Sequence, residues 1–135
     1  MLREPIFIDT SAWFAIKDVG DAGYASAMNF MSQRPHLVTT NFIIDETITL
    51  VRAHLGHRDA VDIGERLWRG EMATIIWITR EDEQAAWELF RRYDDKDFSF
   101  TDCTSFVVMR RLGITQAFTF DDHFGQTGEF VCVPA

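Results

Sequence analysis

Four acidic residues that are far apart in the sequence each lie near a predicted boundary between a strand and a helix. Asp9 and Asp121 each end an apolar run, whereas Glu46 and Asp102 lie early in two predicted helices. Carboxylates that share a small volume repel one another and raise each other's pKa. Divalent cations relieve that repulsion, and Mg²⁺ binds one or two carboxylates while keeping waters for a phosphate substrate. The spacing therefore predicts a carboxylate site suited to Mg²⁺.

An ordinary structural explanation also fits these acids when each is considered alone. Asp102 follows Ser99 at the spacing of a capping box, and Asp82 follows Thr79 at the same spacing, where we expect no chemistry. Capping is therefore the better explanation of Asp102 by itself. An aspartate after a strand is also common turn chemistry. Only the convergence of several acids at one edge of a sheet favours a site.

Several neighbouring side chains have open assignments. Thr10 and Ser11 fit as N-caps of the helix that follows Asp9. A helical wheel places Glu46 and Asp45 just beyond opposite edges of an apolar stripe, so the wheel does not choose between them. Two further residues are candidates near the predicted site. Asp97 fits a solvated loop better than a secondary carboxylate, and His123 fits a surface or capping position better than a role toward substrate.

Strands alternate with helices or helix pairs along the whole chain, which predicts a parallel sheet with helices on both faces. The carboxyl ends of all strands then share one edge, where open α/β sheets bind ligands. The residues 1–135 are expected to form a single domain. The predicted strands cover residues 5–9, 36–40, 74–78, 116–121 and 130–133, and the helices 11–17, 22–33, 41–55, 58–69, 80–93, 99–112 and 122–126.

The composition narrows the functional classes. Hydrophobic residues make up 47% of the 135 residues, with 12 Phe and 4 Trp, which is ample material for a core. No apolar run is long enough to span a bilayer, and the N-terminus lacks a signal-peptide pattern, so we expect a cytoplasmic protein without membrane contact. The net charge of −8 argues against a sequence-reading DNA-binding domain but is compatible with a nuclease that binds cations.

Four segments together resemble the motifs of the PIN domain, in the branch of VapC-like toxins from bacterial and archaeal toxin–antitoxin pairs. They are Ile8-Asp9-Thr10-Ser11, Glu46 in its helix, Phe98-Ser99-Phe100-Thr101-Asp102, and Thr119-Phe120-Asp121-Asp122-His123-Phe124. None is very specific alone, but the set in this order covers essentially the whole chain. The resemblance implies a three-layer sandwich with a five-stranded parallel sheet in the order 3-2-1-4-5.

The resemblance also assigns residues to the site. It implies Asp9, Glu46, Asp102 and Asp121 as the metal-binding and catalytic carboxylates, and it favours Glu46 over Asp45. Ser11, or Thr10, matches the hydroxyl after the first acid, and Thr101 matches a hydroxyl just before the third. Asp122 is an alternative to its neighbour as the fourth acid.

The function implied by the resemblance is a metal-dependent endoribonuclease. With Mg²⁺ or Mn²⁺, such an enzyme hydrolyses RNA phosphodiester bonds to leave a 5′-phosphate and a 3′-hydroxyl. The implied partners are the RNA substrate, a cognate antitoxin protein whose tail blocks the cleft, and a second copy in a homodimer.

Other classes fit the residues less well. A haloacid dehalogenase-type phosphatase needs a second acid two residues after the first, where this chain has Ser11. A receiver domain needs paired acids and a late lysine, and the chain has only Lys17 and Lys96. The alternative outside enzymology is a non-catalytic PIN-like domain that binds RNA or acts as a scaffold.

Overall fold

The computed structural model describes residues 3–135 and contains one five-stranded sheet. All four strand pairings are parallel, and the strand order is β3-β2-β1-β4-β5, which confirms the predicted order. β1 is the central strand: β2 and β3 extend the sheet on one side of it, and β4 and β5 extend the sheet on the other side. The strands are β1 Pro5–Ile8, β2 His36–Thr40, β3 Thr74–Ile76, β4 Gln116–Phe118 and β5 Val131–Val133.

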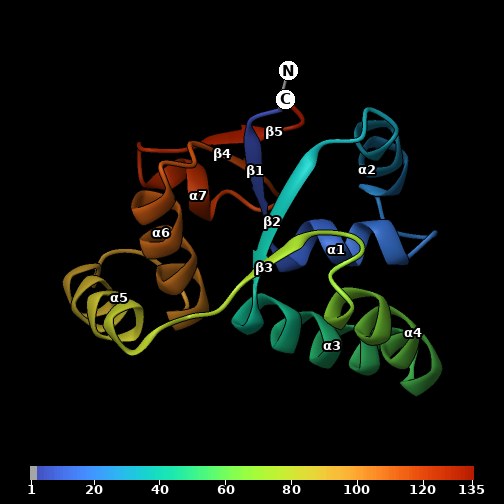
Figure 1. Ribbon diagram of the computed structural model, residues 1–135, viewed down its shortest axis with the longest axis horizontal. Helices are drawn as coiled ribbons and strands as arrows, with labels where there is room; N and C mark the ends of the chain where they lie inside the picture. Colours follow the sequence, from blue (N-terminus) through green and yellow to red (C-terminus); the bar gives the residue numbers. More distant parts are fainter. Residues whose placement is uncertain (1–2) are drawn as a thin grey trace.

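The helices form two groups on either side of the sheet, which gives the three layers expected (Figure 1). In one group, α3 packs against α4 and α1, and α1 packs against α2. In the other, α6 packs against α5 and α7. The helices are α1 Thr10–Lys17, α2 Tyr24–Met31, α3 Asn41–Leu55, α4 His57–Trp68, α5 Arg80–Arg92, α6 Phe100–Leu112 and α7 His123–Gln126.

The core is built around the central strand and its aromatic neighbours. Phe7 and Ile8 of β1 are fully buried, as are Phe106 of α6 and Phe124 of α7. The rings of Phe106 and Phe124 meet edge to face, with centroids 5.1 Å apart. Each fully buried aromatic side chain contributes about 1.5–3 kcal/mol to folding. This burial on both faces explains why the strand reads as an unbroken apolar run.

The strand register brings two distant segments to the same edge. Ile8 is paired with Phe118, and the Asp9 backbone N–H donates to the Phe118 carbonyl at 3.3 Å. Residues 9–11 and residues 119–121 therefore leave the sheet side by side. This point between β1 and β4 is where the strand order reverses, which is the usual place for a site in an open α/β sheet.

Several predicted boundaries are wrong by a few residues, for local reasons. The third strand ends at Ile76, because the N–H of Ile78 donates to the Asn41 side chain rather than to a strand. The fourth strand ends at Phe118, so Asp121 follows the strand at a distance instead of ending it. The N-cap of α1 is Asp9, whose carboxylate accepts from the Ala12 N–H, rather than Thr10 or Ser11.

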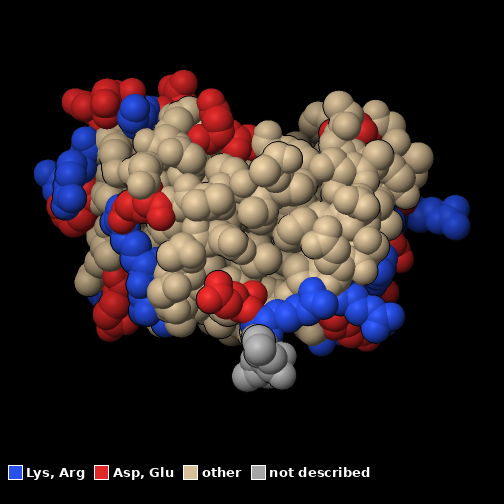
Figure 2. Space-filling model, turned by 90° about the horizontal axis from the view of Figure 1, so that it is seen from above, with Lys and Arg blue, Asp and Glu red and all other residues tan. Residues whose placement is uncertain are grey.

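The opposite edge of the sheet, at the amino ends of the strands, has a different surface. Figure 2 looks down on this edge and shows a face whose centre carries few charged side chains, with acids and bases gathered around its margins. The cluster of predicted site acids belongs to the other edge. None of the helices between residues 3 and 135 combines the length and apolar character needed to cross a membrane.

Candidate active site

Asp9 is buried at the carboxyl end of the central strand, with 4% of its surface exposed. Its Oδ1 accepts from the Ser11 hydroxyl at 2.8 Å and from the Ala12 N–H at 3.3 Å, and its Oδ2 accepts from the Thr119 hydroxyl at 2.8 Å. Burial, and then the charge of Asp121, raise the pKa of Asp9 to about 7 against the opposing effect of these hydrogen bonds. Its ionised form is therefore poorly stabilised by the protein alone.

Ser11 and Thr119 join the two segments that leave the sheet here. The Ser11 hydroxyl accepts from the Phe120 N–H at 2.9 Å and lies 3.2 Å from the Thr119 hydroxyl. The Thr119 hydroxyl also accepts from the Asp121 N–H at 3.2 Å. Ser11 thus lies beside Asp9 as the sequence predicted, whereas Thr119 was missed. The available signal was a hydroxyl directly after an apolar strand.

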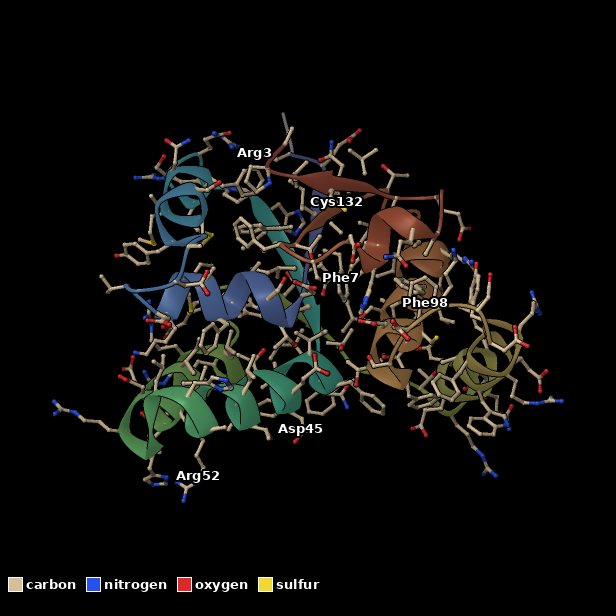
Figure 3. The ribbon with its side chains drawn as sticks, turned by 180° about the vertical axis from the view of Figure 1, so that it is seen from behind. Arg3, Phe7, Asp45, Arg52, Phe98 and Cys132 are labelled. Carbon is tan, nitrogen blue, oxygen red and sulfur yellow. The ribbon has the colours of Figure 1, made fainter. Side chains whose placement is uncertain are left out.

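Glu46 points toward the same edge from α3. Its Oε1 accepts from the hydroxyl of the buried Thr10 at 2.5 Å. Burial raises the pKa of Glu46, the charges of nearby acids raise it further, and the hydrogen bond from Thr10 opposes them; Asp102 and Asp121 are the first of those acids. Asp45 is exposed and points outward from α3 (Figure 3). The tertiary structure therefore separates the two adjacent acids that the helical wheel could not distinguish.

Asp102 caps α6 and also contacts His123, which lies two residues after Asp121. It forms a capping box at the start of α6: its Oδ2 accepts from the Ser99 N–H at 3.0 Å, and its own N–H donates to the Ser99 hydroxyl at 2.9 Å. The same Oδ2 lies 2.7 Å from Nδ1 of His123. Burial is the main cause of a raised pKa of Asp102, and the charge of Asp121 adds to it, while Ser99 and His123 oppose the shift.

Asp121 is the common neighbour of the other three acids. After burial, its charge is the next cause of the raised pKa of Asp9, and it adds a smaller contribution to the raised pKa of Glu46 and of Asp102. Its Oδ1 accepts from the His123 N–H at 3.0 Å. Four acids that are spread over more than a hundred residues of sequence thus lie toward the same carboxyl edge of the sheet.

The remaining predicted residues lie less centrally. Asp122 is exposed at the start of α7 and its side chain caps no helix N–H. Asp97 is exposed in the connection between α5 and α6. Thr101 lies in the first turn of α6, where its carbonyl accepts from the hydroxyls of Thr104 and Ser105.

The acids fit a divalent cation by their electrostatics rather than as a closed cage. Within residues 3–135, no three Asp, Glu, His or Cys side chains come together closely enough to surround an ion. Burial, and then the charges of neighbouring acids, raise the pKa of Asp9, Glu46 and Asp102, and a bound cation would stabilise their ionised forms. Hard carboxylate oxygens are the ligands that Mg²⁺ and Mn²⁺ prefer.

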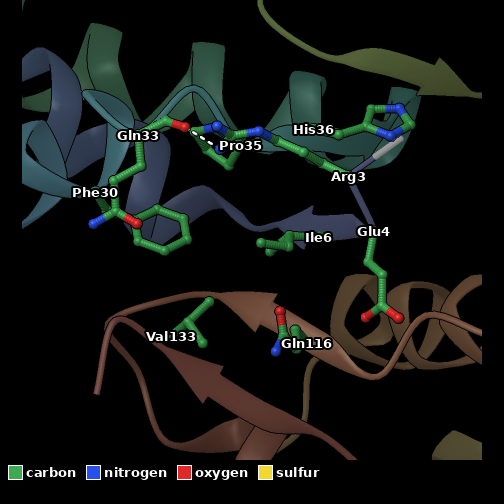
Figure 4. A pocket seen from close by; sticks show the side chains of 9 residues that line it. All are labelled: Arg3, Glu4, Ile6, Phe30, Gln33, Pro35, His36, Gln116 and Val133. Carbon is green, nitrogen blue, oxygen red and sulfur yellow. Dashed lines mark hydrogen bonds between the residues drawn. The ribbon is translucent and has the colours of Figure 1, made fainter. Parts of the chain in front are cut away.

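A cavity of about 530 Å³ lies elsewhere, at the amino ends of the strands (Figure 4). Its lining includes Arg3, Glu4, Phe30 and His36 and contains none of the predicted site residues. The acidic site is therefore separate from this cavity.

Comparison with known proteins identifies the family. The model of the PIN domain matches residues 6–129. The 23S rRNA-specific endonuclease VapC20 of Mycobacterium tuberculosis is 38% identical over 124 residues, which cover 91% of this chain and 94% of that protein. The crystal structure of M. tuberculosis VapC20, described as a Sarcin-Ricin loop cleaving toxin, matches with a TM-score of 0.88 and 37% identity over 93% of this chain and 96% of that one.

More distant structures share the fold alone. VapBC2 from Rickettsia felis, bound to a fragment of promoter DNA, matches with a TM-score of 0.68 at 8% identity and covers 95% of this chain and 96% of that one. FitAcB from Neisseria gonorrhoeae matches with a TM-score of 0.70 at 12% identity and covers 94% and 95%. The family match and the extensive identity with VapC20 together place this chain in the PIN domain family, among the VapC-like toxin ribonucleases.

Proposed function

We propose that this protein is a metal-dependent endoribonuclease that hydrolyses phosphodiester bonds of RNA, with 23S rRNA as its substrate. The observation that carries the proposal is the convergence of four carboxylates at the edge where β1 and β4 end, with the pKa of Asp9 raised to about 7. The substrate is inferred from the similarity to VapC20, which is described as specific for 23S rRNA.

The four acids would hold one or two Mg²⁺ or Mn²⁺ ions, which lower the pKa of a bound water and stabilise charge on the phosphate. Ser11 and Thr119 hold the two oxygens of Asp9, and Thr10 holds one oxygen of Glu46, so the carboxylates are oriented before substrate arrives. With the negative charge neutralised, a polyanionic RNA approaches without repulsion from an acidic pocket.

The reaction is a displacement at phosphorus. A water oxygen forms the new bond to phosphorus, and the bond from phosphorus to the 3′ oxygen breaks. The 3′ oxygen takes up a proton as it leaves, which gives a 3′-hydroxyl end and a 5′-phosphate end. The chain's contribution is to orient the carboxylates and to keep Asp9 away from bulk water.

We further propose a cognate antitoxin and a second copy of the chain as partners, with the protein acting in the cytoplasm. Solved relatives of the same fold include VapBC complexes, in which an antitoxin accompanies the toxin. Trp87 and Phe90 of α5 are exposed and stack with ring centroids 5.9 Å apart, which gives an apolar surface suited to a homodimer.

The test is cleavage of purified ribosomes and of total RNA in the presence of Mg²⁺, Mn²⁺ or EDTA, with 5′ ends mapped by primer extension. The wild type should cut 23S rRNA with either ion and not with EDTA, and Asp9→Asn should abolish cutting. A surface control, Asp95→Asn, should cut like the wild type. Cleavage that persists in Asp9→Asn or in EDTA would contradict the proposed site, and intact RNA in every reaction would favour a non-catalytic binding domain.

A further inference from the structure

His123 contacts two of the four acids, each through a different part of the residue. Its backbone N–H donates to Oδ1 of Asp121 at 3.0 Å. Its ring Nδ1 lies 2.7 Å from Oδ2 of Asp102. Asp121 follows β4 whereas Asp102 belongs to α6, so one residue fixes the distance between carboxylates from two separate elements.

The ring of His123 is itself held in place. The buried Phe98 packs against it edge to face, with ring centroids 5.7 Å apart and planes at 74°. Phe98 is next to Ser99, whose N–H donates to the same Oδ2 of Asp102. Backbone, aromatic packing and the carboxylate contact therefore leave the imidazole little freedom to rotate.

The two oxygens of Asp102 consequently have different surroundings. Oδ2 receives the Ser99 N–H and the His123 ring, whereas within residues 3–135 no side chain or backbone group donates to Oδ1. An ionised carboxylate only accepts hydrogen bonds, so Nδ1 of His123 carries the hydrogen when Asp102 is ionised. The two donors to Oδ2 fix the orientation of the Asp102 carboxylate, and Oδ1 remains available to a ligand.

We infer that His123 is a positioning residue of this site: its Nδ1–H turns Asp102 so that Oδ1 is presented to a divalent cation shared with Asp121. This inference rests on the proposed metal site and deepens it. Partners that orient a ligating carboxylate in this way typically change metal affinity or activity about 10–100-fold when they are removed. His123 acts through Asp102 and does not need to touch the RNA.

Three substitutions separate this role from a role toward substrate. Asn places its amide nitrogen where Nδ1 of His lies, Gln places it where Nε2 lies, and Ala removes both. We expect His123→Asn to keep the contact with Asp102, and His123→Ala and His123→Gln to lose it. His36→Ala, at the exposed start of β2 on the opposite edge, is the matched control.

The primary measurement is Mn²⁺ affinity of the RNA-free protein, from the free-Mn²⁺ signal in electron paramagnetic resonance titrations. His123→Ala and His123→Gln should bind Mn²⁺ about 10–100-fold more weakly than the wild type, while His123→Asn and His36→Ala should bind it nearly as well. His123→Ala and His123→Gln should also have a lower kcat for RNA cleavage at limiting Mn²⁺, with little change in KM for RNA. Saturating Mn²⁺ should restore much of that rate. Chemical denaturation measures the free energy of unfolding of each variant, so a loss of Mn²⁺ affinity caused only by lower stability would be recognised.

Unchanged Mn²⁺ affinity in His123→Ala, or rescue by Gln instead of Asn, would overturn the inference, as would a wild type that binds no Mn²⁺. The proposed function can fail while this inference stands. A wild type that binds Mn²⁺ with the expected dependence on His123 but cuts no RNA would contradict the nuclease activity and not the positioning role.

Discussion

At the scale of single residues, Asp9 shows why a carboxylate is placed where a strand ends. It caps α1 through its Oδ1 and receives two hydroxyl hydrogen bonds, yet burial and Asp121 still raise its pKa to about 7. A carboxylate that served only to cap a helix would be more stable at the surface, where water solvates its charge. The cost of its charge is consistent with a residue whose counterion is a bound cation.

That cost predicts a dependence of stability on pH in the metal-free protein. Because folding raises the pKa of Asp9 from 3.8 to about 7, its contribution to stability is present below pH 4 and is lost as the pH rises through 7. In EDTA at pH 8, Asp9→Asn should therefore be more stable than the wild type by about 2–4 kcal/mol, and the difference should nearly vanish at pH 4.

Denaturant unfolding at the two pH values checks this prediction, with Asp95→Asn at an exposed loop position as the control. A variant that is less stable than the wild type at pH 8 would show that the ionised Asp9 is well stabilised by the protein, contrary to the argument from burial.

The adjacent acids Asp121 and Asp122 provide a second prediction. Asp121 raises the pKa of three site acids, whereas Asp122 is exposed at the start of α7. Asp121→Asn should lower kcat for RNA cleavage by about 100-fold or more, since it removes a cation ligand. Asp122→Asn should cut RNA at nearly the wild-type rate. If Asp122→Asn were the inactive variant, the fourth acid would have been misassigned.

At the scale of elements, α5 and α6 begin with the same kind of capping box, but the acid of each box contacts a different partner. Thr79 and Asp82 cap α5, and Asp82 also pairs with Arg111 at 2.9 Å. Ser99 and Asp102 cap α6, and Asp102 instead contacts His123 in the acidic site. The same local motif is thus structural in one helix and part of the site in the other, because only the start of α6 reaches the edge between β1 and β4.

This pair of helices supplies a matched experiment. Thr79→Ala and Ser99→Ala each remove one N-cap hydrogen bond and should each cost about 1 kcal/mol of unfolding free energy. Only Ser99→Ala should also weaken Mn²⁺ binding and slow RNA cleavage, because it loosens the turn that holds Asp102. An unchanged Mn²⁺ affinity in Ser99→Ala would mean that the cap and the site are independent, and an equal loss of affinity in both variants would mean that the loss comes from lower stability alone.

At the scale of the whole molecule, an aromatic patch extends from the site onto the surface of α5. Four rings are in contact in sequence: Trp87 with Phe90, Phe90 with Phe100, and Phe100 with Phe42 at centroid distances of 5.9, 6.3 and 6.3 Å. Phe100 and Phe42 lie two and four residues before Asp102 and Glu46. A second copy that covered this patch would bring two acidic sites near each other.

The proposed homodimer is therefore expected to depend on this patch. Trp87→Lys should shift the mass measured by light scattering from dimer toward monomer, because it places a charge in an apolar contact. Trp68→Lys is the matched control: Trp68 is a similarly exposed tryptophan on α4 that stacks on Trp77, away from this patch. Dissociation by the control alone would place the dimer contact at α4 instead.

Much of the fold follows from local chemistry along the chain. The unbroken apolar run at residues 6–8 and the apolar pair Ala117 and Phe118 predict buried strands, and the capping boxes at Ser99 and Thr79 predict where two helices begin. The boundaries that differ, such as the early end of β3 at Ile76, depend on a contact with Asn41, which lies far away in the sequence. Periodicity carries no information about such contacts.

The sequence by itself determined the alternation of strands and helices, and it predicted the edge of the sheet at which the candidate acids would lie. The tertiary structure alone decided the details: that Glu46 faces the site while Asp45 faces solvent, that Thr119 holds Asp9, and that His123 joins Asp102 to Asp121. Each depends on the register of β1 against β4 and on the packing of α3 and α6, which set distances between residues far apart in the chain.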